Sequence, residues 1–162
     1  MPVKRKISQR IIIRPPRISD VDQLLKIERQ AFRAHRFSRQ QFLYYIHEEA
    51  SIFAVAESEG ELIGYIAGTV HGEKGKCSAR LYSMAVLARW RRFGIGARLL
   101  TYFEAGARRR KCVSIVLQVR PNNRPAQALY RKFGYSRAAV LRDYYGRGKP
   151  GLEMRKPLEK GN

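Results

Sequence analysis

The fold is decided by Leu81-Tyr82-Ser83-Met84-Ala85-Val86, followed shortly by Arg91-Arg92-Phe93-Gly94-Ile95-Gly96. The first segment is an apolar run typical of a strand, and an amphipathic helix begins near Ile95. Glycines at a strand-to-helix turn leave backbone N–H groups open to a ligand, because no Cβ blocks them. Those groups lie at the positive end of the helix dipole, and the neighbouring arginines add charged donors. The stretch therefore predicts a cradle for a pyrophosphate.

Strand and helix patterns alternate on both sides of this cradle. Strands are expected over 10–14, 51–56, 62–70, 80–87, 112–119, 135–141 and 152–154. Helices are expected after the Ser19-Asp20 cap, after the capping box Ser38-Arg39-Gln40-Gln41, over 95–109 and over 123–133. A polar turn over 57–61 predicts a hairpin between the second and third strands. The resulting order is β-α-α-β-β-β-α-β-α-β-β.

Length and composition favour one globular domain. We expect a basic N-terminal tail over 1–9 and a single domain over 10–158 of the 162 residues. The apolar fraction of 44% is ordinary for a folded chain. No apolar run approaches the roughly 20 residues that span a bilayer, and Ile11-Ile12-Ile13 is too short for a signal-peptide core. These features predict a cytoplasmic protein with no membrane partner.

The charge of the chain is strongly positive. Lysine and arginine number 33 against 13 acidic residues, a formal net charge of +20. A single ligand bound through its pyrophosphate carries only a few negative charges and does not account for this excess. Two interpretations stay open: a solvated basic surface that aids solubility, or attraction to a polyanionic partner such as ribosomal RNA or an acidic protein.

The cysteines and histidines give no metal-ligand pattern. Cys77 and Cys112 are the only cysteines, with no CxxC spacing, and we expect both to be free thiols. His35, His47 and His71 also lack ligand spacing. The sequence therefore predicts no metal site.

Two motifs carry a resemblance to a known family. Val86 through Gly96 contains R-x-x-G-x-G, and Asn123 through Tyr135 contains N-x-x-A-x-x-x-Y-x-x-x-G-Y. With the element order, they make nearly the whole chain similar to the GNAT superfamily of N-acetyltransferases. The resemblance implies an α/β (α+β) three-layer sandwich, with a mixed central sheet of about six to seven strands flanked by about four helices. The branch it most resembles is the RimI-like and N-terminal protein acetyltransferases, through segments 117–120, 128–130, 143–145 and 154–158.

The resemblance implies acetyl transfer from acetyl-CoA to an amine, by direct attack in a ternary complex. It makes Met84, Ala85 and Val86 the backbone contacts of the pantetheine and the acetyl carbonyl. It assigns the pyrophosphate to the cradle, and Asn123 and Tyr130 to the rest of the cofactor. The implied cradle residues are Arg91, Arg92, Phe93, Gly94, Ile95, Gly96 and Ala97.

Tyr130 and Asn123 each have a plain structural alternative. The resemblance makes Tyr130 the general acid that protonates the departing thiolate, a step for which a positioned phenol is suited. Tyr130 is equally placed as a core aromatic of an amphipathic helix. Asn123 is equally placed as the N-cap of that helix.

Gln118 departs from the family pattern. The RimI-like enzymes carry a glutamate there as the proposed general base, whereas an amide accepts no proton at neutral pH. A lysine amine, with a pKa of about 10.4, costs about 4–5 kcal/mol to present neutral at pH 7, and an α-amine costs only about 1 kcal/mol. A site without a strong base therefore favours an N-terminal amine, with Gln118 orienting water. A reduced-activity or repurposed enzyme is the other interpretation.

Tyr144 and Tyr145 are the expected substrate-binding pair. In the related enzymes such a pair lies in the hairpin between the last two strands and covers the peptide, and the plain alternative is packing on a strand end. The residues that follow, 146–151, are basic and rich in glycine. They predict a mobile cationic lip that favours an acidic or neutral peptide.

Three functions therefore stay open. The first is acetylation of a protein or peptide α-amine, and the second is the same chemistry on a small amine or a lysine side chain. The third is a CoA-binding module associated with RNA or the ribosome, with weak catalysis. Its support is the +20 charge and Gln118, although no RNA-binding motif is present.

Overall fold

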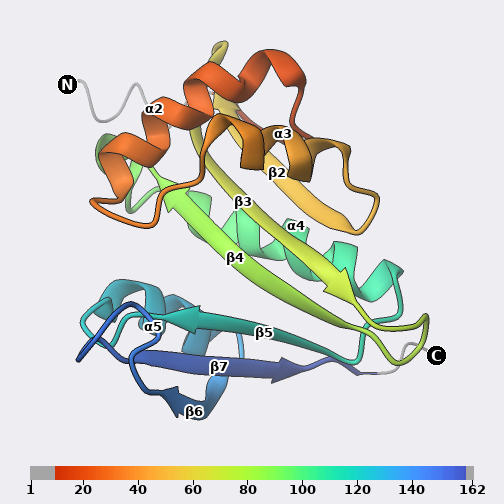
Figure 1. Ribbon diagram of the computed structural model, residues 1–162. Helices are drawn as coiled ribbons and strands as arrows, with labels where there is room; N and C mark the ends of the chain where they lie inside the picture. The colour runs from red at the N-terminus through yellow and green to blue at the C-terminus, as the bar shows by residue number, and fades with distance from the viewer. Residues whose placement is uncertain (1–9, 160–162) are drawn as a thin grey trace. The chain divides into compact units, whose positions relative to one another are not determined.

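The computed structural model describes residues 10–159 (Figure 1). The strands are β1 (Ile11–Arg14), β2 (Ser51–Ser58), β3 (Glu61–His71), β4 (Ser78–Val86), β5 (Ser114–Val119), β6 (Ser136–Leu141) and β7 (Gly151–Pro157). The helices are α2 (Val21–Ala31), α3 (Arg39–His47), α4 (Ile95–Arg109) and α5 (Arg124–Lys132), with short 3-10 turns at Ile18–Asp20 and Ala88–Trp90. The basic tail predicted at 1–9 lies outside the described residues.

The seven strands form one mixed sheet in the order β1-β2-β3-β4-β5-β7-β6. β4 and β5 run parallel, whereas β1 with β2, β5 with β7 and β6 with β7 run antiparallel. The last strand thus inserts between β5 and β6, as Figure 1 shows. Within residues 10–159, a mixed sheet of seven strands with four helices confirms the predicted fold class.

The described residues divide into two compact units. Unit 1 holds 10–68 and 83–103, and unit 2 holds 69–82 and 104–159. In unit 1, α2 and α3 cover one face of the strands and the first part of α4 covers the other (Figure 1). In unit 2, the core is built on β5, β7 and β6, whose inward side chains include Ile115, Leu117 and Met154.

The core of unit 1 encloses a buried carboxylate. Glu28 on α2 is 1% exposed, and its Oε2 accepts a hydrogen bond from the backbone N–H of Phe37 at 2.8 Å. Its Oε1 accepts from the hydroxyl of Tyr65, which also contacts Ser83 Oγ at 2.6 Å. Burial raises the pKa of Glu28, although the bonds from Tyr65 and Phe37 oppose this shift. The Phe42 ring packs edge-on against Tyr65 at 5.5 Å and shields the cluster.

Unit 2 holds both cysteines in direct contact. Cys77 and Cys112 are buried free thiols, as predicted, with their Sγ atoms 2.8 Å apart. The backbone N–H of Val113 donates to the carbonyl of Cys77 at 2.8 Å. Burial and the contact with Cys77 raise the pKa of Cys112 to about 12. The loops that lead into β4 and β5 are therefore joined by main-chain and sulfur contacts.

Local signals located the helix starts well, with one correction. The capping box is confirmed: Ser38 Oγ accepts from Gln41 N–H at 3.1 Å, and Gln41 Oε1 accepts from Ser38 N–H at 2.8 Å. Asp20 directly precedes α2 but its side chain does not cap the helix. Its carboxylate instead forms two bonds with the Arg14 guanidinium, at 2.8 and 2.9 Å. The charged partner, which lies on β1, is the stronger attraction for this carboxylate.

The prediction for the last strand was too short. It covered 152–154, whereas β7 runs from Gly151 to Pro157. The missed residues include the cations Arg155 and Lys156, which hydropathy places outside a strand. Backbone pairing of both β5 and β6 with β7 extends the strand across them.

Candidate functional site

The cradle predicted at 91–97 is a strained turn that leads directly into α4. Arg92 and Gly94 both adopt the left-handed backbone region, with φ of +68° and +74°. That region favours glycine, and a residue such as Arg92 occupies it only where the surrounding structure enforces it. The N–H of Arg98 donates to the carbonyl of Gly94 at 3.1 Å, which closes the first turn of α4. The amides of Ile95, Gly96 and Ala97 are therefore the helix-start donors that have no intrahelical acceptor.

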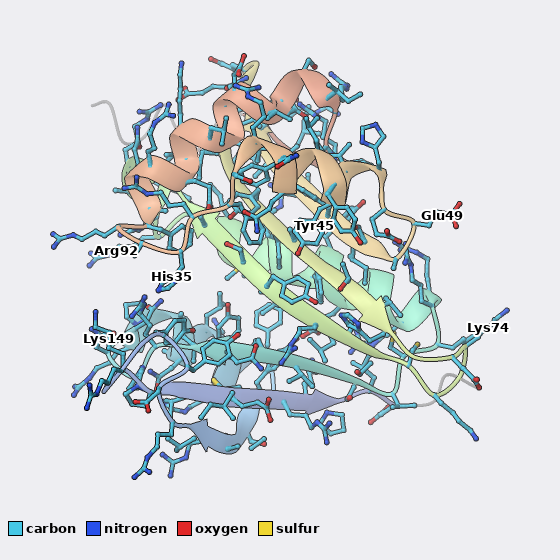
Figure 2. All side chains as sticks on the ribbon, viewed as in Figure 1. His35, Tyr45, Glu49, Lys74, Arg92 and Lys149 are labelled. Atoms are coloured by element: carbon cyan, nitrogen blue, oxygen red, sulfur yellow. The ribbon has the colours of Figure 1, made fainter. Side chains whose placement is uncertain are left out.

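The side chains around this turn hold its backbone in place. The Phe93 ring packs on Trp90 with centroids 6.0 Å apart, and Trp90 itself is buried. Arg91 Nε donates to the carbonyl of Val86 at 3.4 Å, which ties the turn to the end of β4. The exposed Arg92 is labelled in Figure 2. The turn therefore offers backbone donors beside arginine side chains.

The end of β4 packs closely against a glycine of the neighbouring strand β3. Ala85 is buried, and Met84 and Val86 are half-buried. A Cβ placed on Gly64 of β3 would lie 2.8 Å from the carbonyl oxygen of Ala85, closer than real Cβ contacts. Only glycine lets β3 approach this segment so closely. Unit 1 thus brings together the predicted residues Met84–Val86 and 91–97 on consecutive elements.

In unit 2, Asn123 and Tyr130 lie at the start and near the end of α5. Asn123 Oδ1 accepts from the N–H of Ala126 at 3.3 Å, so the N-cap role is present. Tyr130 is buried and packs against Tyr135, with ring centroids 5.7 Å apart. Burial, and secondarily the nearby Tyr145, raise the pKa of Tyr130 well above its ordinary value. Tyr130 is therefore a firmly protonated phenol, which is the form that donates a proton.

Gln118 lies on β5 directly opposite Glu153 of β7 in the strand register. Its Nε2 donates to Glu153 Oε1 at 3.1 Å, and its Oε1 accepts from the Tyr144 hydroxyl at 3.3 Å. Sequence reasoning missed Glu153, because only the pairing of β5 with β7 brings it to Gln118. The available signal was its position as the one acidic residue in a basic final strand.

The Tyr144–Tyr145 pair lies in the connection between β6 and β7, where it was predicted. The two rings meet edge-to-face with centroids 4.8 Å apart, and the Arg120 guanidinium lies 4.2 Å from the Tyr145 ring centroid. Tyr144 is 46% exposed. Burial, and then the proximity of Tyr144, raise the pKa of Tyr145 to about 12. Unit 2 therefore gathers Gln118 and both tyrosines around β5, β7 and this connection.

The connection itself is closed by hydrogen bonds. Tyr145 N–H donates to the carbonyl of Lys149 at 2.9 Å, and Gly148 N–H donates to Asp143 Oδ1 at 2.7 Å. Figure 2 draws Lys149 among other nitrogen-bearing side chains at this end of unit 2. Residues 146–151 therefore carry cationic side chains on a backbone turn that these two hydrogen bonds close.

Metal and membrane features were sought in the part of the chain that the structure describes. Residues 10–159 contain no group of three or more histidine, cysteine or acidic side chains placed to hold a metal ion. Within the same residues, no helix combines the length and the apolar character needed to cross a membrane.

Comparison with known proteins names the family. The model of the acetyltransferase (GNAT) family matches residues 19–135. The chain belongs to this family. It is also similar to an N-alpha-acetyltransferase of Sulfurisphaera tokodaii, with 35% identity over 90% of this chain and 92% of that protein. An uncharacterized N-acetyltransferase of Methanocaldococcus jannaschii is 33% identical, over 93% of this chain and 96% of that one.

Solved structures share the fold of this acetyltransferase. It resembles Ard1 from Thermoplasma volcanium with a TM-score of 0.84 and 26% identity, over 92% of this chain and 98% of that chain. Naa20 of Chaetomium thermophilum, solved in complex with a bisubstrate analogue, gives a TM-score of 0.82 at 29% identity, over 92% and 87% of the two chains. The similarity to each of these two structures covers 92% of this acetyltransferase.

Proposed function

We propose that this acetyltransferase transfers the acetyl group of acetyl-CoA to the N-terminal α-amine of a protein or peptide. The observation that carries the choice of acceptor is its 35% identity to an N-alpha-acetyltransferase over nearly the full length of both chains. The Naa20 structure with its bisubstrate analogue supports the same choice. Residues 10–158 act as one catalytic domain in this proposal, and a cytoplasmic location is part of it.

The cofactor is held mainly by backbone groups. The amides at 92–97 bind the pyrophosphate, because the strained turn and the start of α4 present N–H donors to an anion. The arginines beside them, Arg91 and Arg92, add positive charge. Backbone groups of Met84, Ala85 and Val86 bind the pantetheine and the acetyl carbonyl, and Asn123 contributes a further hydrogen bond to the pantetheine.

The chemistry is a direct displacement. The amine nitrogen attacks the thioester carbon, a C–N bond forms, and the C–S bond breaks. The departing sulfur takes the proton of the Tyr130 hydroxyl, which burial keeps protonated. The proton that the amine loses needs an acceptor other than the Gln118 amide. Tyr144 and Tyr145 position the peptide, with Tyr145 held under Arg120.

Two alternatives concern the identity of the acceptor amine and the binding of a polyanionic partner. An α-amine costs only about 1 kcal/mol to present as the neutral nucleophile at pH 7, whereas a lysine amine costs about 4–5 kcal/mol. A small amine or a lysine side chain is therefore the second candidate. The charge of +20 supports a polyanionic partner, such as RNA or an acidic protein, in addition to acetyl transfer.

A thiol-release assay with N-terminal peptides tests the proposal. We expect CoA release with peptides that carry a free N-terminus, and none with the same peptides acetylated at the N-terminus but carrying an internal lysine. Release only with the internal lysines would overturn the choice of acceptor. Tyr130→Phe is expected to lower kcat by about 10²–10⁴-fold without changing the Kd for acetyl-CoA. The matched control is Tyr102→Phe, a half-buried tyrosine of α4 outside the proposed site.

A further inference from the structure

A carboxylate lies next to the residue that replaces the family's base. Gln118 and Glu153 are directly opposed in the antiparallel pair of β5 and β7. Directly opposed residues project to the same face of a sheet. The 3.1 Å bond from Gln118 Nε2 to Glu153 Oε1 shows that both side chains meet there. Position 118 therefore lacks a carboxylate, yet one is presented from the neighbouring strand.

The hydrogen bonds fix the orientation of the Gln118 amide. An ionised carboxylate only accepts hydrogen bonds, so Nε2 must face Glu153. The Oε1 atom then faces the Tyr144 hydroxyl, which donates to it at 3.3 Å. Glu153 and Gln118 are both half-buried, and Tyr144 is 46% exposed. A carboxylate in this setting is reachable by solvent and belongs to the same cluster as the proposed peptide-positioning tyrosine.

Glu153 is the one carboxylate available on the strands around Gln118. β5, β6 and β7 together contain one acidic residue, which is Glu153. The charged groups near it along the strands are cations: Arg155 follows two residues later in β7, and Arg120 comes two residues after Gln118. On β6 its register partner is Ala139, with Arg137 beyond the irregularity in that strand. Tyr144 is the titratable group that joins this cluster through Gln118.

We propose that Glu153 is the proton acceptor of the acetyl transfer. The proposal rests on the proposed function and completes it. As the amine nitrogen bonds to the acetyl carbon, its proton passes to the Glu153 carboxylate, directly or through one water. The sulfur takes its proton from Tyr130. Afterwards Glu153 releases its proton to solvent, and solvent supplies one proton to Tyr130. Gln118 is a positioning residue that holds the carboxylate.

Moving the carboxylate between the two strands is the sharpest test. Steady-state kinetics with an N-terminal peptide are compared for the wild type, Glu153→Gln and the double variant Gln118→Glu/Glu153→Gln. We expect Glu153→Gln to lower kcat by about 10²–10⁴-fold and to leave the KM for acetyl-CoA unchanged. The double variant restores the carboxylate at position 118, and we expect it to regain at least about tenfold of the lost rate.

The controls separate this inference from the proposed function. Glu73→Gln, an exposed residue of unit 2, is the matched charge control and is expected to retain the wild-type rate. Should Glu153→Gln not fold, Glu153→Asp keeps the carboxylate and is expected to retain measurable turnover at a lower rate than the wild type. An active wild type with Glu153→Gln within about threefold of it, or a double variant as slow as Glu153→Gln, overturns the role of Glu153. A wild type inactive on every N-terminal peptide instead contradicts the proposed function.

Discussion

Glu28 in unit 1 and Glu153 in unit 2 are both held by hydrogen bonds, but to very different degrees. Glu28 is 1% exposed and has a donor on each oxygen, the Tyr65 hydroxyl and the Phe37 amide. Glu153 is half-buried, and within residues 10–159 the structure gives it a bond at Oε1, from Gln118. Both oxygens of Glu28 therefore accept a hydrogen bond from a neighbour, whereas Glu153 can accept further hydrogen bonds.

The difference separates a structural carboxylate from one suited to chemistry. Glu28 links α2, β3 and the residues that lead into α3, so its bonds stabilise the packing of unit 1. Glu153 is attached by the side chain of a single neighbour, so a change there affects few buried groups. Perturbing Glu28 should therefore change stability first, whereas perturbing Glu153 should change turnover first.

The largest effect on stability is expected from Glu28→Ala. Truncation leaves the Tyr65 hydroxyl and the Phe37 amide buried without their acceptor, which costs about 2–4 kcal/mol of the free energy of unfolding. The melting temperature should fall by roughly 5–15 °C. Urea denaturation measures the loss, with Glu153→Gln as the comparison, expected within about 1 kcal/mol of the wild type. Equal losses in the two variants would remove the distinction between the two carboxylates.

Tyr65→Phe should have a smaller effect. It removes the hydroxyl that joins Glu28 to Ser83 but keeps the ring packed against Phe42. We expect a loss of about 1–2 kcal/mol in the free energy of unfolding. A double-mutant cycle with Glu28→Gln measures the coupling, and we expect an interaction free energy of about 0.5–2 kcal/mol. Additive losses would show that Glu28 and Tyr65 stabilise the fold independently.

The smallest effect is a pH dependence at Glu28. Burial raises the pKa of Glu28 above the ordinary 4.5, so the folded protein binds this proton more tightly than the unfolded protein does. The stabilisation from this proton is therefore full below pH 4.5 and is lost as the pH rises through the pKa of Glu28 in the folded protein. Glutamine does not titrate. The advantage of the wild type over Glu28→Gln should therefore be larger at pH 5 than at pH 7. Urea denaturation of both proteins at each pH checks the sign, and a gap that shrinks on acidification would contradict it.

Local patterns were enough to predict much of the molecule. The apolar spacing after Gly94 predicted a helix over 95–109, and α4 has those bounds. Ser38 and Gln41 predicted a capping box, which forms because its partners are three residues apart. The turn at the start of α4 was predicted for the same reason, since glycine, arginine and a helix start all act over a few residues.

Long-range contacts explain what sequence patterns missed. Asp20 binds Arg14 of β1 instead of capping α2, and no helix pattern contains that information. Glu153 meets Gln118 only because β7 inserts between β5 and β6. A shift of one residue in that register would send Glu153 to the opposite face. The candidate base is thus a product of strand order and register.

The paired thiols give unit 2 a built-in chemical reporter. Reagents that label cysteine react with the thiolate, and the raised pKa of Cys112, about 12, keeps that form scarce in the closed structure. Labelling at neutral pH therefore proceeds through conformations in which the loops before β4 and β5 have separated. Its rate as a function of denaturant distinguishes local opening at Cys77 and Cys112 from unfolding of the whole chain.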